Sequence, residues 1–171
     1  MLKKWIWLAL LTIVLDQITK VWFNTSLDMY ERVPVMPMLN FTLMFNEGAA
    51  FSFLSNAGGW QRWFFTALAV VVSVFITLWL RKLPEDEKLQ AAGLSLVLGG
   101  AIGNVIDRIA YGHVVDFIDF FYKADSCIIG FYSSGSECHW PAFNIADSAI
   151  FLGAAFLIIT SFKSEKKTEK E

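Results

Sequence analysis

Two short acidic segments contain the residues best suited to chemistry. Asp116 ends the run Gly112-His113-Val114-Val115-Asp116, and Asp147 lies in the run Phe143-Asn144-Ile145-Ala146-Asp147. We expect both at the outward-facing ends of apolar helices, and an acid in a spanning segment is by default a functional hypothesis. Two carboxyls held close together cannot both ionise cheaply, so they can share one proton and provide one general acid and one general base. These residues predict an aspartyl dyad at a membrane surface.

The composition predicts that apolar helices position these acids. The chain has 171 residues, of which 56% are hydrophobic and 18% charged, which exceeds the usual apolar share of a soluble domain. A span needs about 20 mostly apolar residues. Four stretches qualify: residues 5–23, 63–80, 89–110 and 141–162. We therefore predict a single integral membrane domain over residues 1–171, with connecting segments 24–62 and 111–140 and a tail at 163–171.

Lysine and arginine predict the orientation of these spans. They gather before the first span, between the second and third, and in the tail, whereas residues 24–62 and 111–140 contain only Arg32, Arg62 and Lys123. The positive-inside rule then places both termini in the cytoplasm and both acidic segments toward the outer face. The first span continues to Phe23 without a small-residue cleavage site, so we expect a retained helix rather than a cleaved signal peptide.

The fold class that we expect is an all-α membrane protein of four spans, with a small extracytoplasmic β-containing segment between the first two. Residues 39–45 mix apolar and polar positions, which is typical of a strand. The motif Asn46-Glu47-Gly48-Ala49-Ala50-Phe51 follows, and its glycine permits close backbone approach to a ligand. The alternative for this motif is an ordinary turn.

The third span combines small residues with a polar end. Gly99 and Gly103 permit close helix contact in a membrane. Asn104 lies one turn from Asp107 and Arg108 and can share a face with either. The alternative is that Arg108 is an anchor that reaches the headgroups.

The fourth and first spans add further polar residues. We expect the fourth span to begin at Pro141, which places Asp147 about 9 Å along the axis with Asn144 one turn before it. A structural pair between Asp147 and Arg108 is the alternative. In the first span Asp16 and Lys20 are spaced for an ion pair within one helix, and the outward course of that helix brings Lys20 toward the acids.

Other chemistries lack support. The sequence has no H-E-x-x-H, no G-x-S-x-G and no Walker-type loop, so acids are the available catalytic groups. His113, His139 and the two cysteines lack a recognised metal spacing, and we expect neither a metal nor a cofactor. No cluster of basic and aromatic residues indicates nucleic-acid binding. Cys127 and Cys138 lie in the outer segment, where we expect a disulfide worth about 2–3 kcal/mol; two free thiols are the alternative.

Five motifs in this order resemble the bacterial lipoprotein signal peptidases, also called signal peptidase II. They are Asp16-Gln17-Ile18-Thr19-Lys20, the Asn46 to Phe51 motif, Gly103 to Arg108, Val114 to Phe117, and Phe143 to Ser148. The resemblance spans nearly the whole chain. The segment from Phe120 to Trp140 departs from it, because it is longer than usual and contains both cysteines.

The resemblance implies a membrane aspartic endopeptidase of the bacterial inner membrane. Such an enzyme removes signal peptides from diacylglyceryl-modified prolipoproteins by cleavage before the lipidated cysteine. Asp116 and Asp147 match its catalytic pair, and Asp119 is the local rival of Asp116. The positions that shape or support the site are Asp16, Lys20, Asn46, Gly48, Asn104, Arg108 and Asn144, and we add Asp107 beside Arg108. Partners are then prolipoproteins and membrane lipids, with a monomer as the default state.

Two other classes of protein remain as alternatives. A small proton- or ion-coupled carrier would also place acids and a lysine inside a four-helix bundle, but it would be expected to show repeat symmetry and broken helices at mid-membrane. A purely structural membrane protein is the third possibility. Cleavage of a prolipoprotein would distinguish the peptidase from both of these alternatives.

Overall fold

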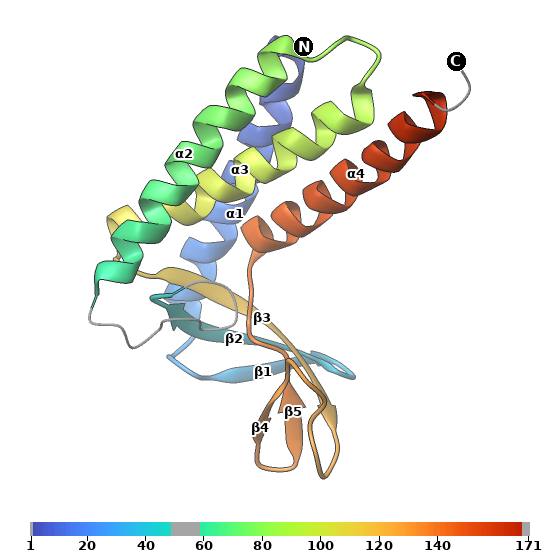
Figure 1. The fold of residues 1–171 in the computed structure, drawn as a ribbon. Helices are drawn as coiled ribbons and strands as arrows, with labels where there is room; N and C mark the ends of the chain where they lie inside the picture. The colour runs from blue at the N-terminus through green and yellow to red at the C-terminus, as the bar shows by residue number, and fades with distance from the viewer. Residues whose placement is uncertain (1, 49–58, 169–171) are drawn as a thin grey trace. The chain divides into compact units, whose positions relative to one another are not determined.

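The computed structural model describes residues 2–48 and 59–168 of the chain (Figure 1). Its helices are α1 (Leu2–Ser26), α2 (Trp60–Lys82), α3 (Lys88–Ala110) and α4 (Ile145–Thr168). All four are long and apolar enough to cross a membrane. Ala49, Ala50 and Phe51 of the predicted loop motif lie outside the described residues.

The start of the fourth helix differs from the prediction. It begins at Ile145 rather than at Pro141, because the residues before it are extended. Phe143 forms an isolated bridge with Ile118, in which the amide of Phe143 donates to the carbonyl of Ile118 at 3.1 Å. Asp147 is therefore the third helical residue, and the predicted depth of about 9 Å along the axis is wrong.

A five-stranded antiparallel sheet accompanies the helices (Figure 1). Its strands are β1 (Arg32–Met36), β2 (Leu39–Asn46), β3 (Val114–Lys123), β4 (Tyr132–Ser134) and β5 (Glu137–His139), in the order β1-β2-β3-β5-β4. The β structure predicted between the first two spans is confirmed by β1 and β2. The all-α class is wrong, because residues 111–140 contribute three further strands. The run from Val114 to Tyr122 is rich in β-branched and aromatic residues, which favour a strand.

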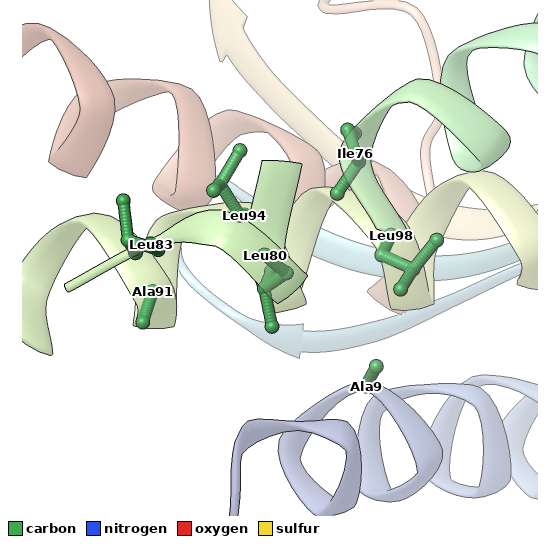
Figure 2. Close-up of a cluster of buried hydrophobic side chains, with 7 residues drawn as sticks. All are labelled: Ala9, Ile76, Leu80, Leu83, Ala91, Leu94 and Leu98. Carbon is green, nitrogen blue, oxygen red and sulfur yellow. The ribbon is translucent and has the colours of Figure 1, made fainter. Parts of the chain in front are cut away.

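The chain forms two compact units, which are described separately. The first contains the described residues of 2–16, 68–105 and 145–168, and the second those of 17–48, 59–67 and 106–144. The first unit is helical. Figure 2 shows its buried apolar cluster, which consists of Ala9, Ile76, Leu80, Leu83, Ala91, Leu94 and Leu98. Exposed apolar side chains on α2 and α4, such as Phe75 and Phe151, suit contact with lipid.

Small residues set the spacing of the helices in the first unit. A Cβ atom placed on Gly153 would lie 2.6 Å from the carbonyl oxygen of Gly93, so α4 and α3 touch through their backbones. A Cβ on Gly99 would lie 2.8 Å from the carbonyl oxygen of Ala9 in α1. The predicted helix-packing role of Gly99 is confirmed, and close contact of this kind is how helices associate in lipid.

The second unit contains the whole sheet, with β3 at its centre. The β2–β3 pairing places Asn40 opposite Asp119 and Met44 opposite Asp116, with a bulge between these two pairs. Phe117 of β3 stacks on Phe23 of α1 with ring centroids 4.3 Å apart. This stack fixes the last turns of α1 against the strand that carries Asp116.

Candidate active site

Asp116 lies in strand β3, six residues beyond the end of α3, and not at a helix end as expected. Its side chain is only 2% exposed. The Nδ2 of Asn144 donates to Oδ1 at 2.7 Å, and the Nδ2 of Asn46 donates to Oδ2 at 3.1 Å. Asn144 also donates to the carbonyl of Val115 at 3.2 Å. The structure thus brings two predicted site residues, Asn46 and Asn144, together around the buried carboxyl group of a third, Asp116.

The loop that follows Asn46 has a defined local structure up to Gly48. The amide of Gly48 donates to Oδ1 of Asn46 at 3.0 Å, which leaves the other end of that side chain for Asp116. The Nη2 of Arg108 donates to the carbonyl of Gly48 at 2.9 Å. Arg108, at the end of α3, therefore holds the loop at Gly48 in place, and this loop orients Asn46.

Asp107 is the centre of a second buried network. It is fully buried, and Lys20 Nζ lies 2.9 Å from its Oδ2. Gln17 donates to Oδ1 at 2.8 Å, and the amide of Val115 donates to Oδ2 at 3.1 Å. The sequence predicted Asp16, within the same helix, as the partner of Lys20, and the structure gives Lys20 the partner Asp107 on α3. Since Val115 precedes Asp116, the network fixes the strand at the carboxylate.

Asp147 belongs to the first unit, in the first turn of α4. The Nδ2 of Asn104 donates to its Oδ1 at 2.8 Å. A negative charge in the first helical turn interacts favourably with the helix dipole and with the free amides at that end. Asn104 of α3 and the helix start together orient this second carboxylate.

Asp16 binds the start of α4 from a distant part of the chain. It is fully buried, and its Oδ1 accepts a hydrogen bond from the amide of Ala146 at 2.8 Å. This amide is one of the donors that a helix start leaves unpaired, so Asp16 acts as a cap supplied by another helix. A Cβ on Gly103 would lie 2.5 Å from Asp16 Oδ2, so the glycine makes room for the carboxylate.

A cavity of about 640 Å³ adjoins Asp116 in the second unit. It is lined by Met29, Tyr30, Arg32, Met44, Phe45, Asn46, Glu47, His113, Asp116, Tyr132, Pro141 and Ala142. His113 also lines a second cavity of about 340 Å³. Burial lowers the pKa of His113, while Asp107 and Glu47 oppose the shift, and the ring stacks on Phe45 with centroids 4.0 Å apart. A largely neutral imidazole therefore borders the site at neutral pH.

Sequence reasoning missed a third polar group, built on the far part of β3. Asp119 is fully buried and binds Nδ1 of His139 at 2.8 Å. Cys127 and Cys138 are joined by a disulfide, which closes the segment that contains β4 and ends beside His139. A period-two reading of residues 114–123 would have placed Asp119 on the opposite strand face from Asp116, although no local signal marks His139 as its partner.

Comparison with known proteins identifies the family to which the chain belongs. The family described as signal peptidase (SPase) II matches residues 8–163. The lipoprotein signal peptidase of Hydrogenovibrio crunogenus is 53% identical over 165 residues, covering 96% of this chain and 88% of the relative. That of Alteromonas mediterranea is 48% identical over 168 residues, covering 98% and 85%.

Solved structures agree with these relatives. A bacterial membrane enzyme determined by the in meso method at 2.3 Å resolution superposes with a TM-score of 0.81 at 30% identity, covering 100% of this chain and 94% of that one. Another, at 1.9 Å, has a TM-score of 0.76 at 30% identity, covering 95% of each chain. The four helices able to span a membrane and the family match together define a multi-pass membrane protease. The chain belongs to the signal peptidase II family, and the carrier alternative finds no support.

Proposed function

We propose that this protein is an aspartic endopeptidase that removes signal peptides from diacylglyceryl-modified prolipoproteins. It cuts the peptide bond before the lipidated cysteine, with Asp116 and Asp147 as the catalytic pair. Family membership supports the protease class, and the family relatives are lipoprotein signal peptidases. The assignment of the two aspartates rests on their surroundings.

The observation that carries the proposal is the kind of hydrogen-bond donor at each acid. Both oxygens of Asp116 accept from side-chain amides, and Oδ1 of Asp147 accepts from another. Neutral amide donors orient a carboxyl group and favour its ionised form only moderately, because they add no full positive charge. This arrangement suits groups that gain and lose a proton during a reaction cycle.

In the mechanism that we propose, the two carboxyls hold one proton between them. The ionised member removes a proton from water, and the water oxygen attacks the scissile carbonyl carbon. The protonated member donates to the carbonyl oxygen. Collapse of the tetrahedral intermediate breaks the carbon–nitrogen bond, and a proton passes to the leaving amine of the lipidated cysteine. The products are a free signal peptide carboxylate and a new amino terminus.

The remaining residues of the predicted site act by positioning. Asp107 and Lys20 fix the strand at Val115, and Arg108 holds the loop at Gly48 that orients Asn46. Asp16 caps the helix that begins two residues before Asp147. We infer that these contacts hold each of the two carboxyl groups in place within its own unit.

The proposed location follows from the helices and their flanking charges. We propose one membrane domain in the bacterial cytoplasmic membrane, with both termini in the cytoplasm and the site toward the outer face. The acyl chains of the substrate and its apolar signal peptide then remain in the lipid while the scissile bond reaches the site. A monomer surrounded by lipid is sufficient for this reaction.

The test is cleavage of a diacylglyceryl-modified prolipoprotein by the purified protein, beside Asp116→Asn and Asp147→Asn. Both variants should bind substrate and lose cleavage, because an amide can neither accept nor deliver the proton. Folding is checked by thermal melting in detergent. An inert wild type would refute the proposed activity, and a folded variant with full activity would refute the dyad.

A further inference from the structure

A buried polar cluster occupies the sheet away from Asp116. Asp119 Oδ1 and Oδ2 lie 2.8 and 3.0 Å from Nδ1 of His139, and the Nδ2 of Asn40 donates to Oδ2 at 3.1 Å. Asp119 and His139 are both fully buried, and Asn40 is 6% exposed. Buried polar groups need partners, and here three strands supply them to one another.

The strand register explains why these side chains meet. Asn40 is opposite Asp119, His139 is opposite Phe121, and Tyr132 is opposite His139. Directly opposed residues share a sheet face, and so do residues two apart on one strand. The ring of His139 lies between Phe121 and Tyr132, with centroid distances of 5.6 and 5.5 Å. The cluster therefore forms a fixed layer on one face.

Arg32 is the member of this layer that reaches open space. Its Nε lies 3.8 Å from Asp119 Oδ2, and its Nη1 donates to Oγ of Ser134 at 3.3 Å. Its side chain is 31% exposed, although Nε itself is buried and has no hydrogen-bond partner among the described residues. Since Asp119 is already bonded to His139 and Asn40, it positions the guanidinium of Arg32 without occupying all of its N–H donors.

The exposed part of Arg32 faces a cavity that also touches the proposed catalytic residue. Arg32 and Tyr132 line the same cavity of about 640 Å³ as Asn46 and Asp116. Arg32 is the only lysine or arginine among the described residues that line it. The other acidic lining residue, Glu47, follows Asn46 and therefore belongs to the Asp116 side. The cavity thus has a cationic side and an acidic side.

We propose that Arg32 is a specificity-determining residue that binds an acidic side chain just after the lipidated cysteine of the substrate. This inference rests on the proposed function. The signal peptide is apolar and stays in lipid, so the polar side of the cavity suits the mature segment. Asp119 lies three residues beyond Asp116 along β3, or about 10 Å at 3.3 Å per residue. An extended substrate spans that distance within its first few mature residues.

Tyr132 supports this arrangement as a second donor. Burial raises the pKa of the Tyr132 hydroxyl, Asp119 adds to the rise, and Arg32 opposes it. The hydroxyl consequently keeps its proton at neutral pH and can donate to a carboxylate beside Arg32. Asp119 and His139 touch no substrate in this scheme, and they are positioning residues for Arg32.

The experiment measures kcat and KM for matched lipidated prolipoproteins. Asp, Asn or Lys is placed in turn at the second, third or fourth residue of the mature segment, in which the lipidated cysteine is the first. At one of these positions the wild type should prefer Asp over Lys by roughly tenfold in kcat/KM, chiefly through KM, as expected for one partly exposed charge-assisted hydrogen bond. Arg32→Gln should remove that preference, and Arg32→Lys should keep the order with a smaller ratio.

Lys123→Gln is the matched control, because it removes a 76% exposed cation from the same sheet that does not line the cavity. It should leave the preference unchanged. A wild type that cuts the Asp, Asn and Lys substrates equally well would overturn this inference alone. A preference that persists in Arg32→Gln, or disappears in Lys123→Gln, would also overturn it. A wild type that cuts no substrate would overturn the proposed function and this inference with it.

Discussion

Strand β3 carries two buried aspartates three residues apart, with very different surroundings. Asp116 is 2% exposed, and its two oxygens accept hydrogen bonds from the amides of Asn46 and Asn144. Asp119 is fully buried and contacts the imidazole of His139, with Arg32 3.8 Å away. Alternation along the strand directs the two side chains to opposite faces, and the cavity of about 640 Å³ extends to both sides, since Asp116 and Arg32 both line it.

The comparison shows that burial alone does not identify a catalytic acid. Both aspartates are removed from solvent, and both are fixed by asparagines from β2. The difference is that basic groups surround Asp119, which suits a permanent structural network, whereas amide donors at Asp116 suit proton exchange. These surroundings support the proposal that Asp116 takes part in the chemistry and that Asp119 positions other groups.

The largest expected effect separates these roles directly. Asp116→Asn should lower kcat by about 10²–10⁴-fold, because it removes a general acid–base group. Asp119→Asn retains the shape and part of the hydrogen bonding of the cluster. It should lower kcat less than about tenfold, because the roughly 1–3 kcal/mol that an imperfect buried partner costs falls mainly on folding stability. The kcat of both variants is measured on a prolipoprotein with Asn after the cysteine, so that the substrate has no charge at that position. Equal losses in two folded variants would contradict the assignment.

A smaller effect should follow from removing one asparagine from each carboxylate. Asn144→Ala takes a 2.7 Å hydrogen bond from Asp116 and should lower kcat about tenfold, the equivalent of about 1.4 kcal/mol. Asn40→Ala takes a 3.1 Å hydrogen bond from Asp119 and should mainly lower thermal stability. Turnover per folded molecule and melting temperature are measured for both. The comparison fails if Asn40→Ala slows turnover as strongly as Asn144→Ala.

The sequence predicted the four helices because an apolar run of about 20 residues is long enough to span a membrane as a helix. It did not predict that β2 would pair with β3, since the contact between Asn46 and Asp116 joins residues 70 positions apart. The cap from Asp16 to Ala146, over 130 positions, is equally non-local. The motifs predicted which acids and asparagines belong to the proposed site. They could not assign Asn104 to Asp147 and Asn144 to Asp116, because only tertiary structure decides such partners.

Removing the disulfide should affect stability on the Asp119 side with little effect on turnover. Cys127→Ser combined with Cys138→Ser opens a loop with a sequence separation of 11 and should lower the free energy of unfolding by about 2–3 kcal/mol. Thermal melts before and after reduction with dithiothreitol test this. Reduction should lower the melting temperature of the wild type toward that of the double variant, and it should leave the melting temperature of the double variant unchanged. A loss of turnover as large as that of Asp116→Asn would contradict the separation of the two regions.

The smallest expected effects are opposite pH dependences of folding on the two sides of β3. On the Asp116 side, burial lowers the pKa of His113 below its ordinary value of 6.5. The unfolded chain then takes up this proton more readily than the folded one, so the histidine makes stability fall as pH drops below about 6.5. His113→Phe keeps a ring beside Phe45 and should flatten the acid limb of a plot of melting temperature against pH.

On the Asp119 side the titrating group is Tyr132, whose pKa burial raises above its ordinary value of 10.0. The unfolded chain loses this proton first as the pH rises, so the contribution of Tyr132 to stability is present below pH 10 and lost above it. Tyr132→Phe preserves the ring that stacks on His139 and should flatten the alkaline limb while leaving the acid limb unchanged. If Tyr132→Phe changed the acid limb as much as His113→Phe does, the two faces of β3 would not be energetically separate, and the division between a reacting and a positioning aspartate would lose its physical basis.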